Sequence, residues 1–502
     1  MTKQKPARVR FAPSPTGMTH LGSARTALYN YLLAHQTNGQ FILRIEDTDR
    51  KRYNPESEID LISSLKWLGL NWDEGPDIGG PYAPYRQSER KDIYQSYAQK
   101  LIDMGYAYPC FCTQNRLNEL RKEQQKRKVN PKYDRKCRDI PPLEAAKRVA
   151  NGESHVIRFK TPLTGSITVH DYLRGDITVN NKQLDDFIIV KSDGLALYHL
   201  AAMVDDHLMG ITHVFRGEEW LSTFPFHAHI YRAFGWEEPV WIHLSVFLNP
   251  TGKGKMSKRF AQQMRLKGNS IFIKDIRKMG YIPEGVINWI VLMGWSFDDK
   301  TEFFTLNDLV NNFSIDKLNP SPAAIDFKKL DYFDGLHIRA LSKSELAKRL
   351  KPFYLKAGYS IDDSVLDKVI PLIQVRLHTL NEAPEISGFF FADHVNPNPN
   401  DLIGKHLTID ESIIAAHESY KLLSDLTEFS PSSLEQPLRQ LAEKLGLKAG
   451  QLFGILRVAI TGQKVSPPLL ESMEIIGKET VLNRITIAID LLKSIEGQPN
   501  QS

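Results

Sequence analysis

The sequence predicts an α/β fold that is interrupted by an inserted α+β lobe and followed by an all-α C-terminal half. Three observations predict this arrangement. Apolar strands alternate with amphipathic helices over residues 1–99 and again from about residue 191. The segment between them, 100–190, combines a charged helix with a stretch rich in strand-forming residues. From about residue 265 the apolar spacing is helical, and Pro and Gly divide it at roughly regular intervals.

The composition is that of a globular protein with several domains. The chain has 502 residues, of which 42% are hydrophobic and 25% are charged. A formal net charge of +5 permits a polyanionic partner without requiring one. No apolar run approaches the roughly 18 residues that span a membrane, and the basic N-terminus lacks the apolar part of a secretory signal. The three cysteines are too few for a disulfide scaffold. We therefore expect a cytoplasmic protein with no membrane partner.

The stretch Arg10–Arg25 begins as a strand and ends as a helix. Proline and glycine interrupt the strand, and the helix opens near Gly22. The free backbone N–H groups and the positive dipole end of such a helix attract anions, and His20 in the turn can donate to a phosphate. An ordinary strand–turn–helix with a surface histidine would give the same pattern.

Charged side chains follow several predicted strands. Glu46, Asp47 and Asp49 come directly after the apolar strand at 41–45. Ligands of open α/β sheets bind at the carboxyl edge, so these acids form a candidate site wall, with a polar loop as the alternative. Arg10 and Arg216 also lie at strand ends, and the rigid fork of arginine suits a carboxylate substrate.

All three cysteines lie within the inserted segment. Cys110 and Cys112 form a C-x-C pair, and Cys137 follows a charged helix. Thiolates are strong zinc ligands, and a structural zinc site takes four ligands. Tyr133 and Asp139 are the candidate fourth ligands, because no histidine is nearby. Three unligated thiols remain the alternative.

The last strand of the α/β part runs into a loop rich in lysine and glycine. Lys255 and Lys258 lie in this loop, which is suited to reaching phosphates. A solvated loop would have the same composition. The helical half that follows carries no cluster typical of catalysis, so we expect it to bind a partner.

Two motifs resemble those of class I aminoacyl-tRNA synthetases. The sequence HLGS at 20–23 is similar to their His-Ile-Gly-His motif, and KMSKR at 255–259 is similar to their mobile Lys-Met-Ser-Lys-Ser loop. They occur in the family's order and bracket an interrupted α/β domain. From about residue 8 to at least 380 the chain resembles the bacterial-type glutamyl-tRNA synthetases, notably in RFAPSPTG, FILRIEDTDR, GPYAPYRQSER and VDDHLMGITHVFRGEEW.

The resemblance implies a two-step reaction. ATP, bound with Mg²⁺, and L-glutamate give glutamyl adenylate and pyrophosphate, and the glutamyl group then passes to the 3′ end of tRNA-Glu with release of AMP. The substrate carboxylate is itself the nucleophile, so positioning and electrostatics carry the catalysis. The implied catalytic residues are His20, Gly22, Lys255 and Lys258; the implied ATP-binding residues are Pro13, Thr16, Gly17, His20, Gly22, Ser23 and Lys258.

Glutamate presents two carboxylates and one ammonium group. By match to the family, Arg10 and Arg216 would hold carboxylate, and Ser14 would add a hydrogen bond. Glu46 would take the ammonium, and Tyr198 would form a wall of the pocket. Arg216 should reject glutamine, whose amide leaves a buried guanidinium poorly paired. Some members of the family have Asn where this chain has Ala202, so a direct contact is lost there or is replaced by water.

The resemblance also implies domain limits. A Rossmann-type catalytic domain would comprise 1–99 and 191–262, an acceptor-end binding lobe 100–190, a stem-contact domain 263–335 and a helical anticodon-binding domain 336–502. The cysteine pattern resembles the zinc-binding version of that lobe, although Asp139 stands where zinc-bearing relatives often have histidine. Arg376 resembles the arginine that reads the anticodon. We expect a monomer.

Other assignments fit the sequence less well. Glutaminyl-tRNA synthetases read the anticodon with β-barrels, whereas this C-terminal half is predicted to be helical. Synthetases that glutamylate queuosine in tRNA-Asp lack the anticodon region and are shorter. A non-catalytic RNA-binding paralogue would usually have lost His20, Gly22 or Lys258. A nucleotidyltransferase that uses no RNA would leave the long helical half without a purpose.

Overall fold

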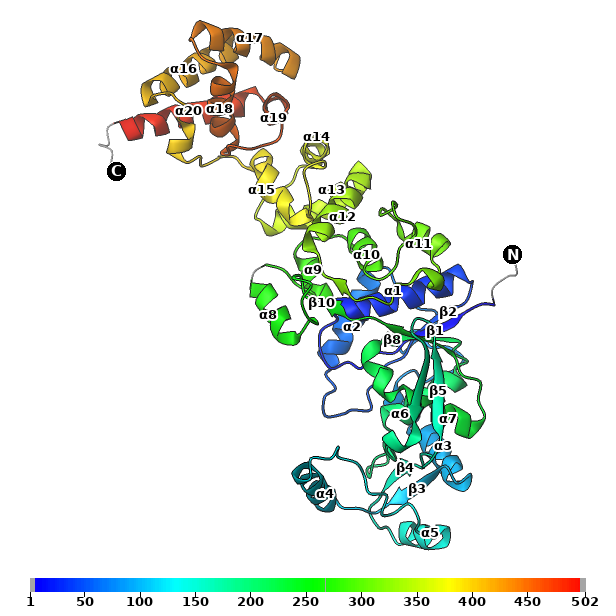
Figure 1. Ribbon diagram of the computed structural model, residues 1–502. Coiled ribbons are helices and arrows are strands. Elements are labelled where there is room, and N and C mark those ends of the chain that lie inside the picture. The colour runs from blue at the N-terminus through cyan, green and yellow to red at the C-terminus, as the bar shows by residue number, and fades with distance from the viewer. Residues whose placement is uncertain (1–4, 267, 497–502) are drawn as a thin grey trace. The chain divides into compact units, whose positions relative to one another are not determined.

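The computed structural model describes residues 5–266 and 268–496, and the chain divides into two compact units (Figure 1). One unit runs to Arg277 and includes Val286–Phe327; the other comprises Lys278–Gly285 and continues from Lys328. The side chains of Lys258 and Glu496 lie outside the description. No helix among the described residues combines the length and the apolar character that crossing a membrane requires.

The first unit is built on a six-stranded sheet with the order β2-β1-β8-β9-β5-β6. All neighbouring pairs are parallel except the hairpin β5–β6. Val9, Arg10 and Phe11 on β1 are 0%, 3% and 5% exposed, so both faces of the strand are covered, as in parallel sheets generally. The strands are β1 (Arg8–Phe11), β2 (Gln40–Leu43), β5 (Ser166–Asp171), β6 (Gly175–Asn180), β8 (His213–Gly217) and β9 (Val240–Leu244).

Helices cover the sheet. The helix α1 packs on β1, β2 and β8, and α7 packs on β5 (Figure 1). Tyr94, Leu200 and Trp241 belong to one buried apolar cluster that joins α3, α6 and β9. The helices of this unit are α1 (Leu21–Gln36), α2 (Pro55–Trp67), α3 (Lys91–Asp103), α6 (Tyr198–Leu208), α7 (Phe224–Phe234), α8 (Lys258–Leu266) and α11 (Leu306–Asn312), with α9 (Ile273–Lys278) and α10 (Pro283–Leu292) at the boundary between the units; a small sheet pairs β10 (Phe247–Leu248) with β11 (Ala323–Ala324).

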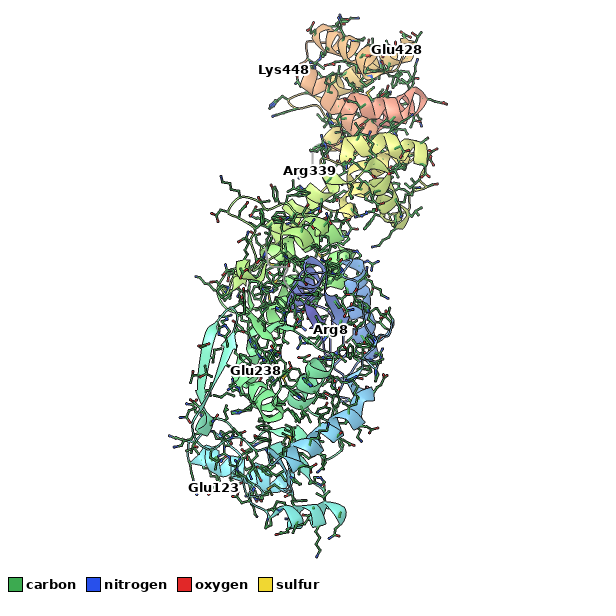
Figure 2. All side chains as sticks on the ribbon, turned by 90° about the vertical axis from the view of Figure 1, so that its right-hand side faces the viewer. Arg8, Glu123, Glu238, Arg339, Glu428 and Lys448 are labelled. Carbon is green, nitrogen blue, oxygen red and sulfur yellow. The ribbon has the colours of Figure 1, made fainter. Side chains whose placement is uncertain are left out.

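The segment predicted as an insert divides between two sheets. Its two ends form an antiparallel sheet of β3 (Ala107–Cys110), β4 (Val156–Phe159) and β7 (Ile188–Val190), with helices α4 (Gln114–Lys126) and α5 (Pro142–Ala150). Glu123, labelled in Figure 2, lies on α4, which has no buried residue. The hairpin β5–β6 instead extends the main sheet, because Asp171 pairs with Trp241 of β9. The insert therefore does not fold as one separate body, and the predicted domain limits stay a prediction.

The second unit is helical throughout its described part. Its interior includes an apolar cluster around Leu350 and Ile370, another around Leu438 and Leu456, and a smaller one around Leu402 and Leu492. The predicted α/β class and the predicted all-α C-terminal half are thus confirmed. The helices are α12 (Phe327–Ala340), α13 (Lys343–Lys356), α14 (Asp363–Ile373), α15 (Ala383–Ser387), α16 (Ile409–Asp425), α17 (Pro431–Lys444), α18 (Ala449–Thr461), α19 (Leu469–Ile476) and α20 (Lys478–Glu496).

Candidate active site

One cavity of about 1310 Å³ in the first unit brings most of the predicted site residues together. It lies at the carboxyl ends of β1 and β8, where polar side chains follow the strands. Lys255 reaches the same cavity from the loop after β10. Ala202, by contrast, is fully buried in α6 and does not line it. The predicted residues that line the cavity are Arg10, Pro13, Ser14, Thr16, Gly17, His20, Gly22, Ser23, Glu46, Tyr198, Arg216 and Lys255.

His20 caps the helix that opens beside the cavity. Its Nδ1 accepts hydrogen bonds from the backbone nitrogens of Gly22 at 3.1 Å and Ser23 at 3.4 Å. The sequence predicted that the N–H groups at this helix start are free. In the structure two of them already donate to the His20 ring. The imidazole is exposed and its Nε2 lies 3.4 Å from the Ser23 hydroxyl. A ligand that binds these backbone N–H groups must therefore displace the His20 ring or share the N–H groups with it.

Gly22 makes room for that ring. A Cβ atom added at Gly22 would lie 3.0 Å from Cε1 and 3.1 Å from Nδ1 of His20. These separations are tighter than ordinary van der Waals contact, so a side chain here would push the imidazole aside. The glycine of this motif thus acts through the position of His20.

Arg10 is held by Asp206 of α6. Its Nε and NH2 groups donate to the two carboxylate oxygens at 2.9 and 3.2 Å, and NH1 is 3.4 Å from the carbonyl of Phe215. Arg44 donates to the same carboxylate at 2.8 Å. The charge of Arg10 is therefore compensated by a carboxylate of the protein in direct contact.

Glu46 lines the cavity and contacts the ion network of Arg10, Arg44 and Asp206 through Arg44. Its Oε1 accepts from NH2 of Arg44 at 3.1 Å, and Gln87 lies 3.5 Å away. Burial raises the pKa of Glu46 to about 7, although the nearby charges of Arg44 and Arg10 act in the opposite direction. Near neutral pH the carboxyl group therefore exchanges between its charged and its neutral form.

Under the role that the family resemblance implies for Glu46, which is to take the ammonium group of glutamate, this pKa predicts a pH-dependent reaction. Only ionised Glu46 can pair with an ammonium group, so kcat/KM for glutamate should rise from about pH 6 to about pH 8 and then level off. Glu46→Gln should flatten the profile and lower kcat/KM at about pH 8 by roughly 10- to 100-fold, the effect of losing one charged hydrogen bond. The measurement is tRNA charging at saturating ATP across this range. A variant that keeps the parental slope would contradict the role of Glu46.

Arg216 lies at the end of β8 and is 5% exposed. Its Nε and NH1 groups donate to His243 and His227, both at 2.8 Å, while NH2 is buried without a hydrogen bond. Burial lowers the pKa of Arg216, and the neighbouring Tyr198 hydroxyl partly offsets this effect. Tyr198 stacks against Trp220 with ring centroids 4.3 Å apart, which forms an aromatic wall of the cavity.

The lysine loop forms a short hairpin beside the cavity. Met256 donates its backbone N–H to the carbonyl of Phe247 at 2.9 Å, and Lys255 forms an antiparallel β-bridge with Leu248. Lys255, Met256 and Ser257 line the cavity. The side chain of Lys258 lies outside the described part of the chain, so its predicted role stays a prediction.

Two acids that hold the arginines around the site, Asp205 and Asp206, were not predicted from the sequence. Asp205 and Asp206 are both fully buried in α6. Asp205 accepts from Arg90 at 2.7 Å, from the Tyr94 hydroxyl at 2.7 Å and from Gln87 at 3.0 Å. Two adjacent carboxylates inside an otherwise apolar helix are costly to bury unless they are paired, and that pattern was visible in the sequence.

The three cysteines meet in the inserted sheet. The Sγ atoms of Cys110, Cys112 and Cys137 lie within 4.8 Å of one another, and all three thiols are free. The Tyr133 hydroxyl lies 3.2 Å from Cys110 and 3.5 Å from Cys112. Asp139 is exposed and is not part of the group. The donor set of three thiols and a phenol oxygen fits a structural zinc ion, which prefers sulfur ligands in a tetrahedral arrangement.

Arg376 lies in the second unit, in the turn after α14. It is exposed, and among the described residues its guanidinium makes no ion pair or hydrogen bond. Arg457 is close enough that its pKa is lowered by burial and by the charge of Arg376. Two neighbouring guanidinium groups, one of them free, form a local positive site on this unit.

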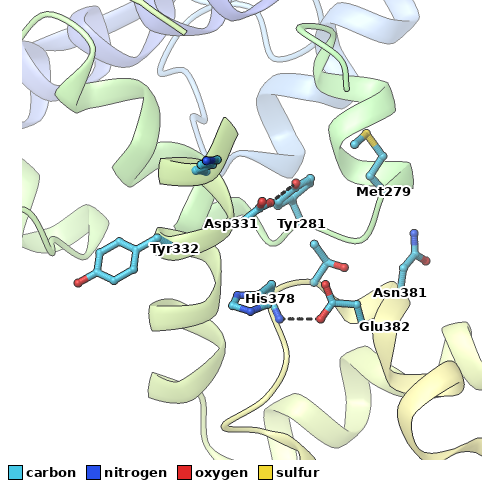
Figure 3. A pocket seen from close by; sticks show the side chains of 9 residues that line it. Met279, Tyr281, Asp331, Tyr332, His378, Asn381 and Glu382 are labelled. Carbon is cyan, nitrogen blue, oxygen red and sulfur yellow. Dashed lines mark hydrogen bonds between the residues drawn. The ribbon is translucent and has the colours of Figure 1, made fainter. Parts of the chain in front are cut away.

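A second cavity, of about 550 Å³, lies in the second unit and was not predicted (Figure 3). Within it Tyr281 donates to Asp331 of α12, and the backbone N–H of His378 donates to Glu382 at 2.8 Å. The first of these bonds joins two side chains of the lining, and the second joins a backbone group to a side chain. The lining residues are Met279, Tyr281, Lys328, Asp331, Tyr332, His378, Thr379, Asn381 and Glu382.

Comparison with known proteins places this geometry in a family. The family model described as tRNA synthetases class I (E and Q), catalytic domain, matches residues 6–332, and an anticodon binding domain model matches residues 345–489. A protein of Dehalococcoides mccartyi named glutamate–tRNA ligase is 44% identical over 493 residues, 97% of this chain and 99% of that protein. The chain belongs to the class I glutamyl-tRNA synthetases. A glutamate–tRNA ligase of Chloroflexus aurantiacus is 42% identical over 504 residues, 98% of this chain and 99% of that protein.

A solved structure extends the glutamyl-tRNA synthetase likeness to three dimensions. The crystal structure of a glutamate tRNA ligase from Elizabethkingia meningosepticum, in complex with its amino acid, is 36% identical with a TM-score of 0.88 and covers 97% of this chain and 99% of that one. The predicted family is therefore confirmed over both the α/β part and the helical half. The helical match to an anticodon binding domain also agrees with the choice of glutamyl- over glutaminyl-tRNA synthetase.

Proposed function

We propose that the chain is a glutamate–tRNA ligase, which activates L-glutamate with ATP and transfers it to the 3′ end of tRNA-Glu. The observation that carries this proposal is the single cavity that holds Arg216, Glu46 and the His20 helix start together. A cationic group, an anionic group and an anion-binding helix end match the side chain, the ammonium group and the triphosphate that must meet for adenylate formation.

The proposed roles follow from charge. Arg10 and Arg216 take the carboxylates of glutamate, Ser14 adds a hydrogen bond, Glu46 takes the ammonium and Tyr198 closes the wall. His20 and the backbone of the helix start bind ATP with its Mg²⁺, together with Pro13, Thr16, Gly17, Gly22 and Ser23, and Lys255 and Lys258 take the departing pyrophosphate. Such contacts stabilise charge that develops on the phosphates in the transition state, which is where catalysis of this reaction is gained.

The direct test is charging of purified tRNA-Glu. The parent protein should attach labelled glutamate at a rate that depends on ATP and Mg²⁺, and glutamine should be a poor substrate because its amide leaves Arg216 unpaired. The same assay with tRNA-Gln determines whether that tRNA is also glutamylated. Preferential charging with glutamine would contradict the proposal.

Adenylate formation should itself depend on tRNA, as the family resemblance implies. We expect ATP–pyrophosphate exchange with glutamate to be low for the protein alone and to rise severalfold when tRNA-Glu is added. Equal exchange rates with and without tRNA would contradict this dependence while leaving the charging reaction intact. A tRNA for another amino acid is the matched control.

The inserted sheet is proposed to hold structural zinc through Cys110, Cys112, Cys137 and Tyr133. Zinc would tie the two loops that carry these ligands, and Tyr133 is a better candidate than Asp139 because its hydroxyl already contacts two thiols. An acceptor-end binding lobe, the proposed role of this region, needs that rigidity to position the tRNA end.

The zinc proposal predicts about one zinc ion per chain by elemental analysis of protein purified without added metal. Cys137→Ser should lose the metal and lower the melting temperature. Tyr133→Phe should weaken metal retention in the presence of a chelator, whereas the neighbouring Asp139→Asn should retain the metal like the parent. Metal loss in Asp139→Asn with retention in Tyr133→Phe would make Asp139 the fourth ligand instead of Tyr133. A parent protein without zinc would overturn the proposed site.

The helical half is proposed to bind the stem and the anticodon of tRNA, with Arg376 as an anticodon contact. Its free guanidinium next to Arg457 suits a nucleotide phosphate or base edge. We further propose that the enzyme acts as a monomer in the cytoplasm, where the three free thiols would stay reduced.

A further inference from the structure

Arg216 is held by two imidazole rings and by no carboxylate. Its Nε donates to Nε2 of His243 and its NH1 group donates to Nδ1 of His227, each at 2.8 Å. Both histidines are fully buried, and the third nitrogen of Arg216, NH2, is buried without a hydrogen bond at a residue that lines the cavity. The guanidinium is therefore fixed on two sides, and the group nearest to it on the cavity side is the neutral hydroxyl of Tyr198.

The hydrogen bonds determine where the protons lie. A guanidinium N–H can only donate, so Nε2 of His243 carries no proton and Nδ1 carries one. That Nδ1 donates to Asp171 at 2.7 Å. Asp171 also accepts from the backbone nitrogens of His243, Leu173 and Arg174, at 3.0, 3.1 and 2.9 Å. A buried carboxylate surrounded by donors thus fixes the tautomer of His243 that Arg216 requires.

The second imidazole, that of His227, connects Arg216 to a further histidine, His199. Nδ1 of His227 accepts from Arg216, and its Nε2 faces Nδ1 of His199 at 3.0 Å. Burial and the charge of Arg216 lower the pKa of His227 well below its ordinary value and that of His199 to about 4. Burial also lowers the pKa of His243, against the effect of Asp171. All three rings are therefore neutral near pH 7, and His227 and His243 accept hydrogen bonds from Arg216 without taking its proton.

Arg10 in the same cavity shows the contrasting arrangement. Two of its nitrogens donate to Asp206, so its charge is compensated by a carboxylate in direct contact. The hydrogen-bond partners of Arg216 are neutral, and its buried charge has no such counterion at that distance. A buried charge without a counterion is costly, and a ligand that supplies a carboxylate relieves this cost.

We infer that His227 and His243 are positioning residues that hold Arg216 through neutral acceptors, so that its charge is left for the side-chain carboxylate of the amino acid substrate. The inference rests on the proposed function, in which that substrate is glutamate. Glutamate would pair with the cavity side of the guanidinium. Glutamine would offer no charge there, so the two histidines contribute to the choice between the two amino acids.

The test compares substitutions that remove the acceptor with substitutions that keep it. His243→Leu removes the acceptor, whereas His243→Gln offers an amide oxygen near the position of Nε2. His227→Leu and His227→Asn form the same pair for Nδ1. His229→Leu is the matched control, because His229 lies on the same helix, α7, but bonds to Asn181 at 3.0 Å instead of to Arg216.

The measurements are KM and kcat for glutamate in tRNA charging at saturating ATP, the KM for ATP, and the ratio of kcat/KM for glutamate to that for glutamine. We expect each Leu variant at 227 and 243 to raise KM for glutamate about tenfold or more and to lower the ratio, with KM for ATP unchanged. The Gln and Asn variants should recover most of the loss, and His229→Leu should match the parent. If one Leu variant does not fold, the pair at the other position carries the comparison.

The outcomes separate this inference from the function on which it rests. A parent that charges tRNA-Glu, together with Leu variants that keep the parental KM for glutamate, overturns the inference alone. An equal rise of KM in His229→Leu would make the effect one of packing and would also overturn it. A parent that charges no tRNA-Glu with glutamate overturns the proposed function, and the inference falls with it.

Discussion

Arg216→Gln should lower kcat/KM for glutamate by roughly 10³-fold, the largest effect expected from any single change in the cavity. Removing one partner of a buried charge pair costs about 2–5 kcal/mol, which spans this range. The substitution keeps the length and some hydrogen-bonding capacity of the side chain but removes its charge. The KM for ATP should stay near the parental value, because the contacts proposed for ATP are made by other residues of the cavity.

The same variant offers a specificity readout. Discrimination against glutamine should shrink, since the neutral amide at position 216 no longer distinguishes a carboxylate from an amide by charge. Arg216→Lys is the informative companion, because lysine keeps the charge but lacks the planar fork that presents Nε to His243 and NH1 to His227. A parental kcat/KM for glutamate in Arg216→Gln would remove this residue from the amino acid site.

His20→Ala should lower the rate of adenylate formation by about 10²–10³-fold, as expected when one preorganised contact to a developing charge is lost. It should also destabilise the protein by about 1 kcal/mol, because the imidazole is the N-cap of α1. These two effects belong to different atoms of the ring. Nδ1 makes the cap, while the proposed phosphate contact belongs to Nε2, which lies 3.4 Å from the Ser23 hydroxyl.

His20→Asn separates the two effects. Asparagine is among the best N-cap residues, so this variant should melt near the parental temperature while its exchange rate falls as in His20→Ala. Both variants are measured by ATP–pyrophosphate exchange in the presence of tRNA-Glu and by thermal unfolding. If His20→Asn regained the parental exchange rate, His20 would act only as a cap, and the phosphate role would be wrong.

Much of the site could be predicted because its motifs are local in sequence. The residues between Arg10 and Ser23 lie on one strand–turn–helix, so a resemblance over this stretch predicts neighbours that the structure does bring into one cavity. The spacing of the three cysteines likewise predicted a cluster of ligand atoms, and the fold places their sulfur atoms together.

What could not be predicted are the contacts between residues far apart in the chain. The hydrogen bonds of Arg10 to Asp206 and of Arg216 to His243 depend on how β1, β8 and β9 pair, and no local pattern specifies those partners. The cap that His20 makes on its own helix was also missed, because the sequence predicts a free helix start but not the rotamer of the histidine.

The position of the hairpin β5–β6 could not be predicted from the sequence for the same reason. β5 alternates exposed and buried residues and β6 alternates exposed and half-buried ones, as a half-covered hairpin would in a separate lobe. The pairing of Asp171 with Trp241 joins the hairpin to the main sheet and also brings the carboxylate of Asp171 to His243. This long-range contact is not specified by any local pattern in the sequence.

The central claim is that glutamate and ATP meet in one cavity, which both Arg216 and His20 line. The most direct test is calorimetric binding of a non-hydrolysable glutamyl adenylate analogue to the parent, Arg216→Gln and His20→Asn. The account predicts one site per chain from which both glutamate and ATP displace the analogue, and weaker binding in each variant. An analogue that only one of the two reactants displaces, or that binds both variants as tightly as the parent, would contradict it.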